Sequence, residues 1–231
     1  MKTIGLLGGM SWESTVPYYR IINEEIRSAL GGLHSAKVLL YSVDFQEIEA
    51  CQAAGDWDRS AALLSDAAAG LERAGADFLV LCTNTMHRVA PQIAGRVGIP
   101  LLHIADAVTA ALQAEGISRA ALLGTKYTMG QAFYREKLTQ AGIEVLVPEG
   151  KDAELVNRVI YDELCLGILS EKSKRSYLRI IGQLTEQGAQ GIVLGCTEIG
   201  LLIRQEDTGV PLFDTACIHA LAAVRYALGR T

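Results

Sequence analysis

The sequence predicts an α/β protein in which parallel sheets carry helices on both faces. Short runs rich in Val, Ile and Leu recur along the chain, amphipathic stretches separate them, and the whole pattern occurs twice. Of the 231 residues, 50% are hydrophobic and 20% are charged, which is typical of a chain with a packed core. We therefore expect two pseudo-symmetric lobes, each built on a doubly wound parallel sheet.

The strands are expected where apolar runs are short and rich in branched side chains. The predicted strands cover residues 3–7, 38–42, 78–81, 101–103, 120–123, 144–147, 192–194 and 212–213. Parallel strands that helices cover on both faces have continuous apolar sequences of this kind. Stretches with helical spacing, such as 60–74 and 173–187, lie between the runs, so the strands are expected to be connected through helices.

The repeat is visible in three pairs of segments that occur in the same order, each pair separated by about half the chain. The first members read TIGLLGG, GADFLVLCTNT and GIPLL, and the second members read RAALLGT, GAQGIVLGCTE and GVPLF. A repeated pattern of this kind predicts two structurally similar lobes. We place the first lobe at residues 1–105, with a C-terminal helix at 214–231 packing back on it, and the second lobe at 106–213.

The repeat also places two reactive groups at equivalent points. Thr83 aligns with Cys196, and each lies just past a predicted strand. Because ligands of parallel α/β sheets bind beyond the carboxyl ends of the strands, we expect an inter-lobe active site with a hydroxyl on one wall and a thiol on the other. Cys82 lies one residue before Thr83, and successive residues of a strand point to opposite sides, so Cys82 is expected to face the core.

This pair of groups suits proton transfer at a carbon atom. Inverting a stereocentre requires one group that removes a proton from one face and another that returns a proton to the opposite face. A free thiol titrates near pH ~8.5, so a modest shift makes it a thiolate base. Cys196 follows an apolar run, and a nearby helix N-terminus is expected to favour its thiolate.

Composition and motif spacing argue against several other classes of protein. The net charge is −5, whereas nucleic-acid-binding proteins are usually basic. GLLGG is not the GxGxxG of a dinucleotide site, and no His/Cys cluster has zinc-ligand spacing, so neither nucleotide nor metal is expected. The five cysteines form no CxxC pair, and no apolar run is long enough for a secretion signal or a membrane span. We therefore expect a cytoplasmic protein with reduced thiols.

Four motifs carry a resemblance to a known family: GLLGGMSWEST, SVDFQEIEACQ, NTMH and GCTEI. The chain resembles the aspartate/glutamate/hydantoin racemase superfamily, and in particular its aspartate racemase branch, over nearly its whole length. The resemblance implies two Rossmann-like lobes, no cofactor, and two cysteines that work from opposite faces of the substrate. In the family the first cysteine immediately precedes Asn-Thr, and Thr83 holds that place here.

The resemblance also implies roles for individual residues, with Thr83 and Cys196 as the catalytic pair. The implied substrate contacts are Met10, Gln52, Asn84, Thr85, Lys126, Thr197 and Glu198. Glu198 either orients Thr197 or the substrate amine, or simply begins a helix. His87 either transfers protons or caps and packs a helix start. Lys126 either pairs with a substrate carboxylate or is a solvated surface residue; some relatives place a lysine near position 165, where this chain has Cys165.

Together these observations predict a cofactor-independent racemase of free aspartate or glutamate. The L-enantiomer is expected to be preferred, because the resemblance places Cys196 on the face of its α-hydrogen and a Thr hydroxyl is far harder to deprotonate. The expected partners are the amino-acid substrate and a second copy of the chain in a homodimer, with no nucleic acid and no membrane. The alternatives are another reaction of the superfamily (decarboxylation, hydantoin racemisation or maleate isomerisation) and a catalytically weak amino-acid-binding protein.

Overall fold

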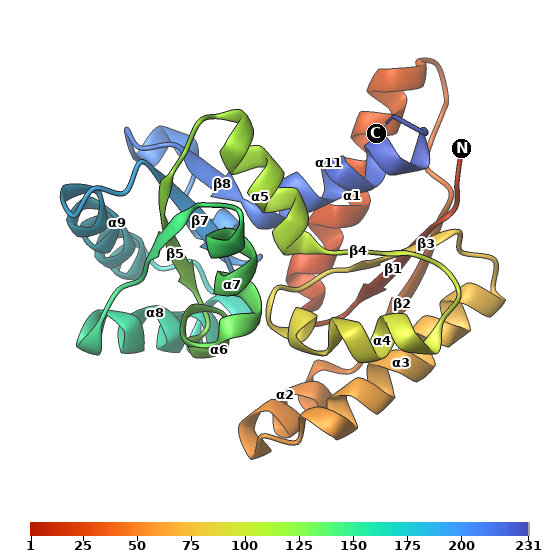
Figure 1. Ribbon diagram of the computed structural model, residues 1–231, viewed down its shortest axis with the longest axis horizontal. Coiled ribbons are helices and arrows are strands. Elements are labelled where there is room, and N and C mark those ends of the chain that lie inside the picture. Colours follow the sequence, from red (N-terminus) through yellow and green to blue (C-terminus); the bar gives the residue numbers. More distant parts are fainter. Residues whose placement is uncertain (231) are drawn as a thin grey trace. The chain divides into compact units, whose positions relative to one another are not determined.

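A computed structural model describes residues 1–230 and confirms the α/β fold class, with two four-stranded parallel sheets (Figure 1). The chain divides into two compact units. Unit 1 contains Met1–Ile104 and the C-terminal residues from His219 onward, and unit 2 is Ala105–Ile218. The main chain therefore leaves unit 1 after Ile104 and returns to it at His219.

The sheet of unit 1 has the strand order β2-β1-β3-β4, with every neighbouring pair parallel. Its strands are β1 (Ile4–Gly8), β2 (Val38–Ser42), β3 (Phe78–Leu81) and β4 (Leu101–Leu102). The helices of this half of the chain are α1 (Trp12–Leu30), α2 (Phe45–Ala54), α3 (Trp57–Arg73), the short 3-10 helix η1 (Thr85–Val89), α4 (Ala90–Arg96) and α5 (Ile104–Ala114). The last helix, α11 (Thr215–Ala227), begins in unit 2 and ends in unit 1.

The sheet of unit 2 repeats this arrangement, with the order β6-β5-β7-β8 and parallel pairing throughout. Its strands are β5 (Arg119–Gly124), β6 (Glu144–Leu146), β7 (Gly191–Gly195) and β8 (Leu212–Asp214). Its helices are α6 (Lys126–Gly130), α7 (Ala132–Gln140), α8 (Gly150–Asp162), η2 (Leu164–Leu166), α9 (Glu171–Glu186), α10 (Ile199–Leu202) and η3 (Gln205–Asp207). In each unit the first strand lies between the second and the third strands of that unit, and this shared strand order matches the repeated sequence pattern.

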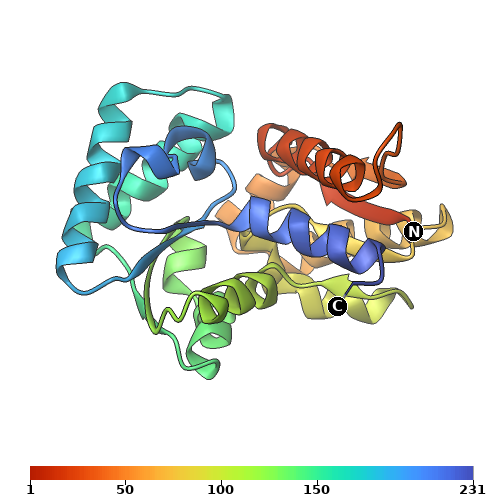
Figure 2. The same cartoon turned by 90° about the horizontal axis from the view of Figure 1, so that it is seen from above.

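Helices cover both faces of each sheet (Figures 1 and 2). In unit 1 the alternation along β3 shows why: the Phe78 ring packs on Tyr226 of α11 at 4.8 Å, whereas Leu79 belongs to the core that α3 closes. The buried face of α3 includes Ala61, Leu64 and Ala68 at helical spacing, and the small alanines allow the helix to lie close to the sheet. Each fully buried leucine of this kind contributes about 1.5–3 kcal/mol.

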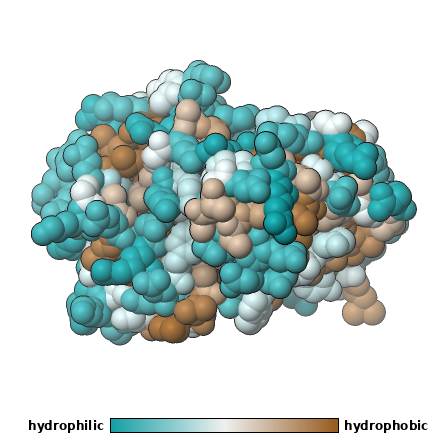
Figure 3. Space-filling view, turned by 90° about the horizontal axis from the view of Figure 1, so that it is seen from below, coloured by the Kyte–Doolittle hydropathy of each residue, from teal (hydrophilic) through white to brown (hydrophobic). Residues whose placement is uncertain are grey.

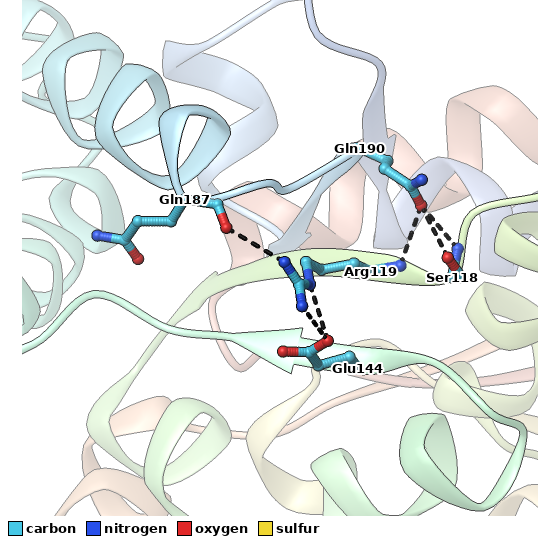
Figure 4. A network of polar contacts seen from close by, with 5 residues as sticks. All are labelled: Ser118, Arg119, Glu144, Gln187 and Gln190. Carbon is cyan, nitrogen blue, oxygen red and sulfur yellow. Dashed lines mark hydrogen bonds and ion pairs between the residues drawn. The ribbon is translucent and has the colours of Figure 1, made fainter.

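Hydrogen bonds and an ion pair connect the amino ends of neighbouring strands in unit 2 (Figure 4). Arg119 Nη2 lies 2.7 Å from Glu144 Oε2 and so joins the first residues of β5 and β6. Gln190, just before β7, accepts from the backbone N–H of Ser118 at 2.9 Å and of Arg119 at 3.1 Å. The ion pair is partly exposed and adds about 0–1 kcal/mol. The network fixes the end of the sheet opposite to the one where parallel sheets bind ligands.

Hydrophilic side chains dominate the face drawn in Figure 3, with separate small apolar groups among them. Within residues 1–230, no helix has the length and apolar character needed to cross a bilayer. The largest exposed apolar side chains of α1 are Trp12, Val16 and Tyr19, which are 64%, 55% and 54% exposed. Their spacing places them along one side of the helix.

Candidate active site

A thiol and a carboxylate meet at the carboxyl end of β7 in unit 2. Cys196 directly follows the strand and is buried, and its Sγ donates to Glu198 Oε2 at 2.9 Å. Thr197 Oγ1 donates to the same carboxylate oxygen, also at 2.9 Å. Cys165 of η2 approaches the other oxygen, with Sγ 3.9 Å from Oε1. We call Cys165, Cys196, Thr197 and Glu198 the thiol cluster.

The thiol cluster raises the proton affinity of Cys196. Burial is the largest cause of a pKa well above the ordinary value, followed by the negative charge of Glu198 and the neighbouring Cys165. The nearby helix N-terminus was expected to favour the thiolate, and the backbone hydrogen bond of Glu198 does act in that direction. The following helix, α10, has only four residues, and the backbone hydrogen bond that lowers the pKa is outweighed. Cys196 is held as a thiol beside a buried carboxylate that can accept its proton.

Tyr177 of α9 packs near the thiol cluster. Its hydroxyl donates to the backbone oxygen of Val156 at 2.9 Å, and the side chain is fully buried. Burial raises its pKa well above the usual range, and the charges of Cys196, Glu163 and Cys165 add to this. Tyr177 and the contact of Cys165 with Glu198 were missed from the sequence, because no local motif links η2 or α9 to the end of β7.

At the equivalent point of unit 1, the chain after β3 carries hydroxyl and amide side chains. Thr83, Asn84 and Thr85 are all buried, and the Thr83 N–H donates to Leu81 O at 2.9 Å. Cys82 is completely buried, and its Sγ lies 3.7 Å from the carbonyl oxygen of Val80. Burial raises the pKa of Cys82 far above the ordinary thiol value. The prediction that Cys82 faces the core is confirmed.

His87 of η1 has both ring nitrogens bound within unit 1. Nδ1 lies 2.7 Å from Thr83 O, and Nε2 receives the backbone N–H of Ile104 at 3.1 Å. The side chain is buried, and burial together with the neighbouring histidines His103 and His219 lowers its pKa well below the usual value. Of the two interpretations left open by the sequence, the structure supports capping and packing.

The side chain of Thr15 holds the loop after β1 through two hydrogen bonds to its backbone. Gly9 has φ +90°, and a Cβ there would collide with the backbone oxygen of Val43, so glycine is required. The Gly9 N–H donates to Thr15 Oγ1 at 2.9 Å, and the same hydroxyl donates to Ser11 O at 2.8 Å. The side chain of Met10 is buried in the core of unit 1.

Gln52 and Lys126 have different surroundings. Gln52 is buried on α2, and its Nε2 lies 3.0 Å from Met86 Sδ, which brings it beside the NTMH segment. Lys126 is exposed at the start of α6, where its backbone N–H donates to Asn157 Oδ1 at 2.8 Å. Its ammonium lies 5.1 Å from the centroid of the Tyr127 ring. Across residues 1–230, no three His, Cys, Asp or Glu side chains are arranged to hold a metal ion.

Comparisons with known proteins cover nearly the whole chain. A family model described as Asp/Glu/Hydantoin racemase matches residues 7–223. Among solved structures, an Asp/Glu racemase candidate from Yersinia pestis is 59% identical, covers 99% of this chain and 100% of its own, and has a TM-score of 0.91. An aspartate racemase homologue from Pyrococcus horikoshii is 37% identical over 99% and 100% of the two chains, with a TM-score of 0.86. The broad specificity amino-acid racemase RacX of Bacillus subtilis is 24% identical over 228 residues, 96% of each chain.

Proposed function

The chain belongs to the Asp/Glu/hydantoin racemase family, and from this premise we propose that it racemises acidic amino acids without a cofactor, with Cys196 as the acid/base group on one face. The observation that carries the proposal is the 2.9 Å hydrogen bond from Cys196 Sγ to Glu198 Oε2. A buried carboxylate at this distance is a proton acceptor for the thiol. The proposal therefore treats Cys196 and Glu198 as one proton-transfer pair.

The proposed reaction begins with the thiol proton moving to Glu198. The resulting thiolate removes the α-hydrogen of the L-enantiomer and leaves a planar carbanion, which Thr83 protonates from the opposite face, directly or through a water molecule. Glu198 then releases its proton to solvent and the Thr83 oxygen takes up one proton from solvent, which restores the starting state. The positive charge of the substrate α-ammonium favours the ionised groups of the thiol cluster, which offsets part of the desolvation that raises the Cys196 pKa.

The two faces are chemically unequal in this scheme, so the two directions should differ in rate. Cys196 has a carboxylate partner, whereas Thr83 offers a hydroxyl whose proton is far harder to remove. We propose that the L-enantiomer is used preferentially. Since enantiomers have equal free energies in water, the preference lies in kinetics and binding and leaves the equilibrium unchanged.

The remaining site residues are proposed as substrate contacts. Asn84, Thr85 and Thr197 would hold the α-amino and α-carboxylate groups, since these buried side chains supply neutral donors and acceptors. Gln52 would contact the substrate through its amide, and Met10 through its backbone. Glu198 would pair with the α-ammonium as well as with Cys196, and Lys126 is the proposed cation for the substrate side chain.

We also propose a homodimer formed through α1. The exposed apolar side chains of Trp12, Val16 and Tyr19 share one side of this helix. Apolar surface gathered in this way is typical of protein–protein contacts. Light scattering at several concentrations tests the proposal: a monomer mass at micromolar concentration contradicts it, and Trp12→Glu should shift a dimer toward monomer.

A second candidate is racemisation of amino acids with neutral side chains. The residues that follow Cys165 include Leu166, Ile168 and Leu169, which are 66%, 50% and 56% exposed. An apolar loop beside the thiol cluster would tolerate uncharged substrate side chains, and a curated relative is named for broad specificity. This candidate keeps the same proton chemistry and changes only the range of substrates.

A chiral assay against both enantiomers of aspartate, glutamate, alanine, serine and lysine tests both candidates. It should be run after dialysis and with EDTA, and activity that returns only when pyridoxal phosphate or a metal is added would contradict the cofactor-independent scheme. In deuterium oxide, a racemase incorporates deuterium at Cα, a decarboxylase loses CO₂, and an amino-acid-binding protein does neither. Cys217→Ala is the matched control, because Cys217 is a cysteine of α11 outside the thiol cluster.

A further inference from the structure

Three histidines of unit 1 pack together in its interior. The ring centroids of His87 and His103 are 4.4 Å apart, and those of His87 and His219 are 5.8 Å apart. His87 and His219 are 1% and 0% exposed. Burial is the main cause that lowers the pKa of both, to about 4 for His219. At neutral pH both rings are therefore uncharged, and each has one donor and one acceptor nitrogen.

The partners of His87 determine which of its nitrogens carries the proton. The backbone N–H of Ile104 can only donate, so Nε2 of His87 must accept at 3.1 Å. Nδ1 then carries the hydrogen and donates to the carbonyl oxygen of Thr83 at 2.7 Å. His219 has the opposite tautomer, because Leu102 O can only accept from its Nε2, which leaves Nδ1 to accept from Tyr18 Oη.

These hydrogen bonds hold the backbone of Thr83 at two points. Its N–H donates to Leu81 O at 2.9 Å, and its carbonyl accepts from His87. Nε2, on the other side of the His87 ring, accepts from the backbone N–H of Ile104. Ile104 is the first residue of α5, so its N–H has no hydrogen-bond acceptor within that helix. The imidazole thus ties Thr83, the second residue after β3, to the start of α5, most of which belongs to unit 2.

We propose that His87 is a positioning residue for Thr83, which it orients through the backbone carbonyl without itself exchanging a proton with substrate. The role of Thr83 rests on the proposed function, whereas the hydrogen bonds of His87 do not. The hydrogen bond from His87 fixes the backbone from which the Thr83 side chain projects. If that hydrogen bond is lost, the Thr83 hydroxyl is no longer held in a single orientation. A protonated His87 would have no acceptor for Ile104, and it would face His103 and His219, so acid breaks the link.

Two substitutions separate the two hydrogen bonds. In His87→Asn the amide nitrogen takes the place of Nδ1 and can donate to Thr83 O, whereas in His87→Gln the amide oxygen takes the place of Nε2 and can accept from Ile104. We expect His87→Asn to keep kcat within about threefold of wild type and His87→Gln to lose about tenfold in kcat, with KM little changed in both. His219→Gln is the control, because His219 lies in the same cluster but bonds neither Thr83 nor Ile104.

The variants give outcomes that decide the proposal. A larger kcat for His87→Asn than for His87→Gln, with His219→Gln near wild type, supports it. Equal kcat values for the two His87 variants, a better His87→Gln, or an equal loss in His219→Gln would overturn it.

A measurement on the unmutated protein keeps the test independent of folding defects and of racemase activity. Nitrogen NMR of the histidine rings should show His87 neutral and protonated on Nδ1, with no titration near pH 6.5. An Nε2-protonated His87, or one that titrates near its ordinary pKa, would overturn the positioning role even in a fully active enzyme. If wild type instead shows no α-hydrogen exchange while the Nδ1 tautomer is present, the proposed function fails and the hydrogen bonds stand.

Discussion

The ends of β3 and β7 occupy equivalent places in two sheets of the same strand order, yet they carry different chemistry. In unit 2, the thiol of Cys196 bonds directly to the carboxylate of Glu198. In unit 1, the side chain at the matching position is the hydroxyl of Thr83, and the titratable neighbour, His87, bonds to the backbone instead. The repeated fold therefore fixes where functional groups stand, and the residues around each strand end decide what they can do.

The two regions also differ in what their partner groups control. Glu198 changes the proton affinity of the thiol, since its charge and its hydrogen bond both raise the Cys196 pKa. His87 bonds to backbone groups through both ring nitrogens, one as a donor and one as an acceptor, so it controls geometry. We therefore propose proton transfer for the thiol cluster and orientation of Thr83 for His87.

The largest expected effect is the loss of the thiol itself. Cys196→Ala should reduce α-hydrogen exchange from the L-enantiomer by about 10²–10⁴-fold, the usual contribution of a positioned acid/base group. Initial deuterium incorporation from deuterium oxide measures this directly. Cys217→Ala should exchange like wild type. Undiminished exchange in Cys196→Ala would show that the difference between the two strand ends has nothing to do with catalysis.

The next effect concerns the unequal faces. Thr83→Cys should place a thiol on the second face and raise exchange from the D-enantiomer by about ten- to a hundredfold, with a smaller change for the L-enantiomer. Thr83→Ser is the matched control, because it keeps a hydroxyl at the same position. A wild type that exchanges both enantiomers at equal rates, or a Thr83→Cys variant without a D-specific gain, would contradict the asymmetric scheme.

The same comparison shows how far sequence reasoning reaches. The GCTE motif placed Cys196, Thr197 and Glu198 just past a strand, and the strand stands where expected. The direction of the Cys196 pKa shift was not predictable, because it depends on the Glu198 side chain folding back onto a sulfur two residues earlier and on burial by the whole unit. Cys165 reaches Glu198 from a distant helix end, which no local spacing reveals.

In unit 1, too, the contacts that could not be predicted join residues far apart in the sequence. NTMH left open whether His87 transfers protons or caps and packs a helix start, because its remote partner, the N–H of Ile104, exists only in the folded chain. Strand ends were also shifted by a residue, as in β1 at Ile4–Gly8 instead of 3–7. Strand ends depend on the register with the neighbouring strands, such as the pairing of Gly8 with Ser42, and periodicity within one segment does not contain that information.

A smaller effect separates the two roles of Glu198. Glu198→Gln removes the negative charge that raises the Cys196 pKa, so more thiolate should form near neutral pH and iodoacetamide should alkylate Cys196 faster. Racemisation should nevertheless fall, by about tenfold, because the proton acceptor is lost. Peptide mapping of the alkylated protein and a chiral assay measure the two quantities. Slower alkylation together with slower racemisation would mean that Glu198 activates the thiolate by another route.

The smallest effect is on stability, and it again distinguishes the two units. All four histidines of the sequence, His34, His87, His103 and His219, lie in unit 1. The folded state lowers the pKa of His87 and His219, so the unfolded chain binds protons more readily. Their stabilisation is fully present above pH 6.5, the ordinary value, and is lost as pH falls toward the folded pKa, which is about 4 for His219.

In unit 2, Asp214 acts in the opposite direction, because burial raises its pKa and its protonation favours the folded state. Asp152 and Asp207 of the same unit have lowered pKa values, and their stabilisation is lost only as pH falls below their ordinary value of 3.8. Hydrogen exchange resolved by unit, between pH 6.5 and 4, should therefore show unit 1 losing protection first. The shift of His219 corresponds to about 3 kcal/mol below pH 4. His219→Gln should have a lower free energy of unfolding than wild type at pH 7, and that free energy should change less with pH. His34→Gln changes an exposed position and should match wild type in both respects. Equal acid sensitivity of the two units, or an unchanged pH slope in His219→Gln, would show that the buried histidines do not control the acid response.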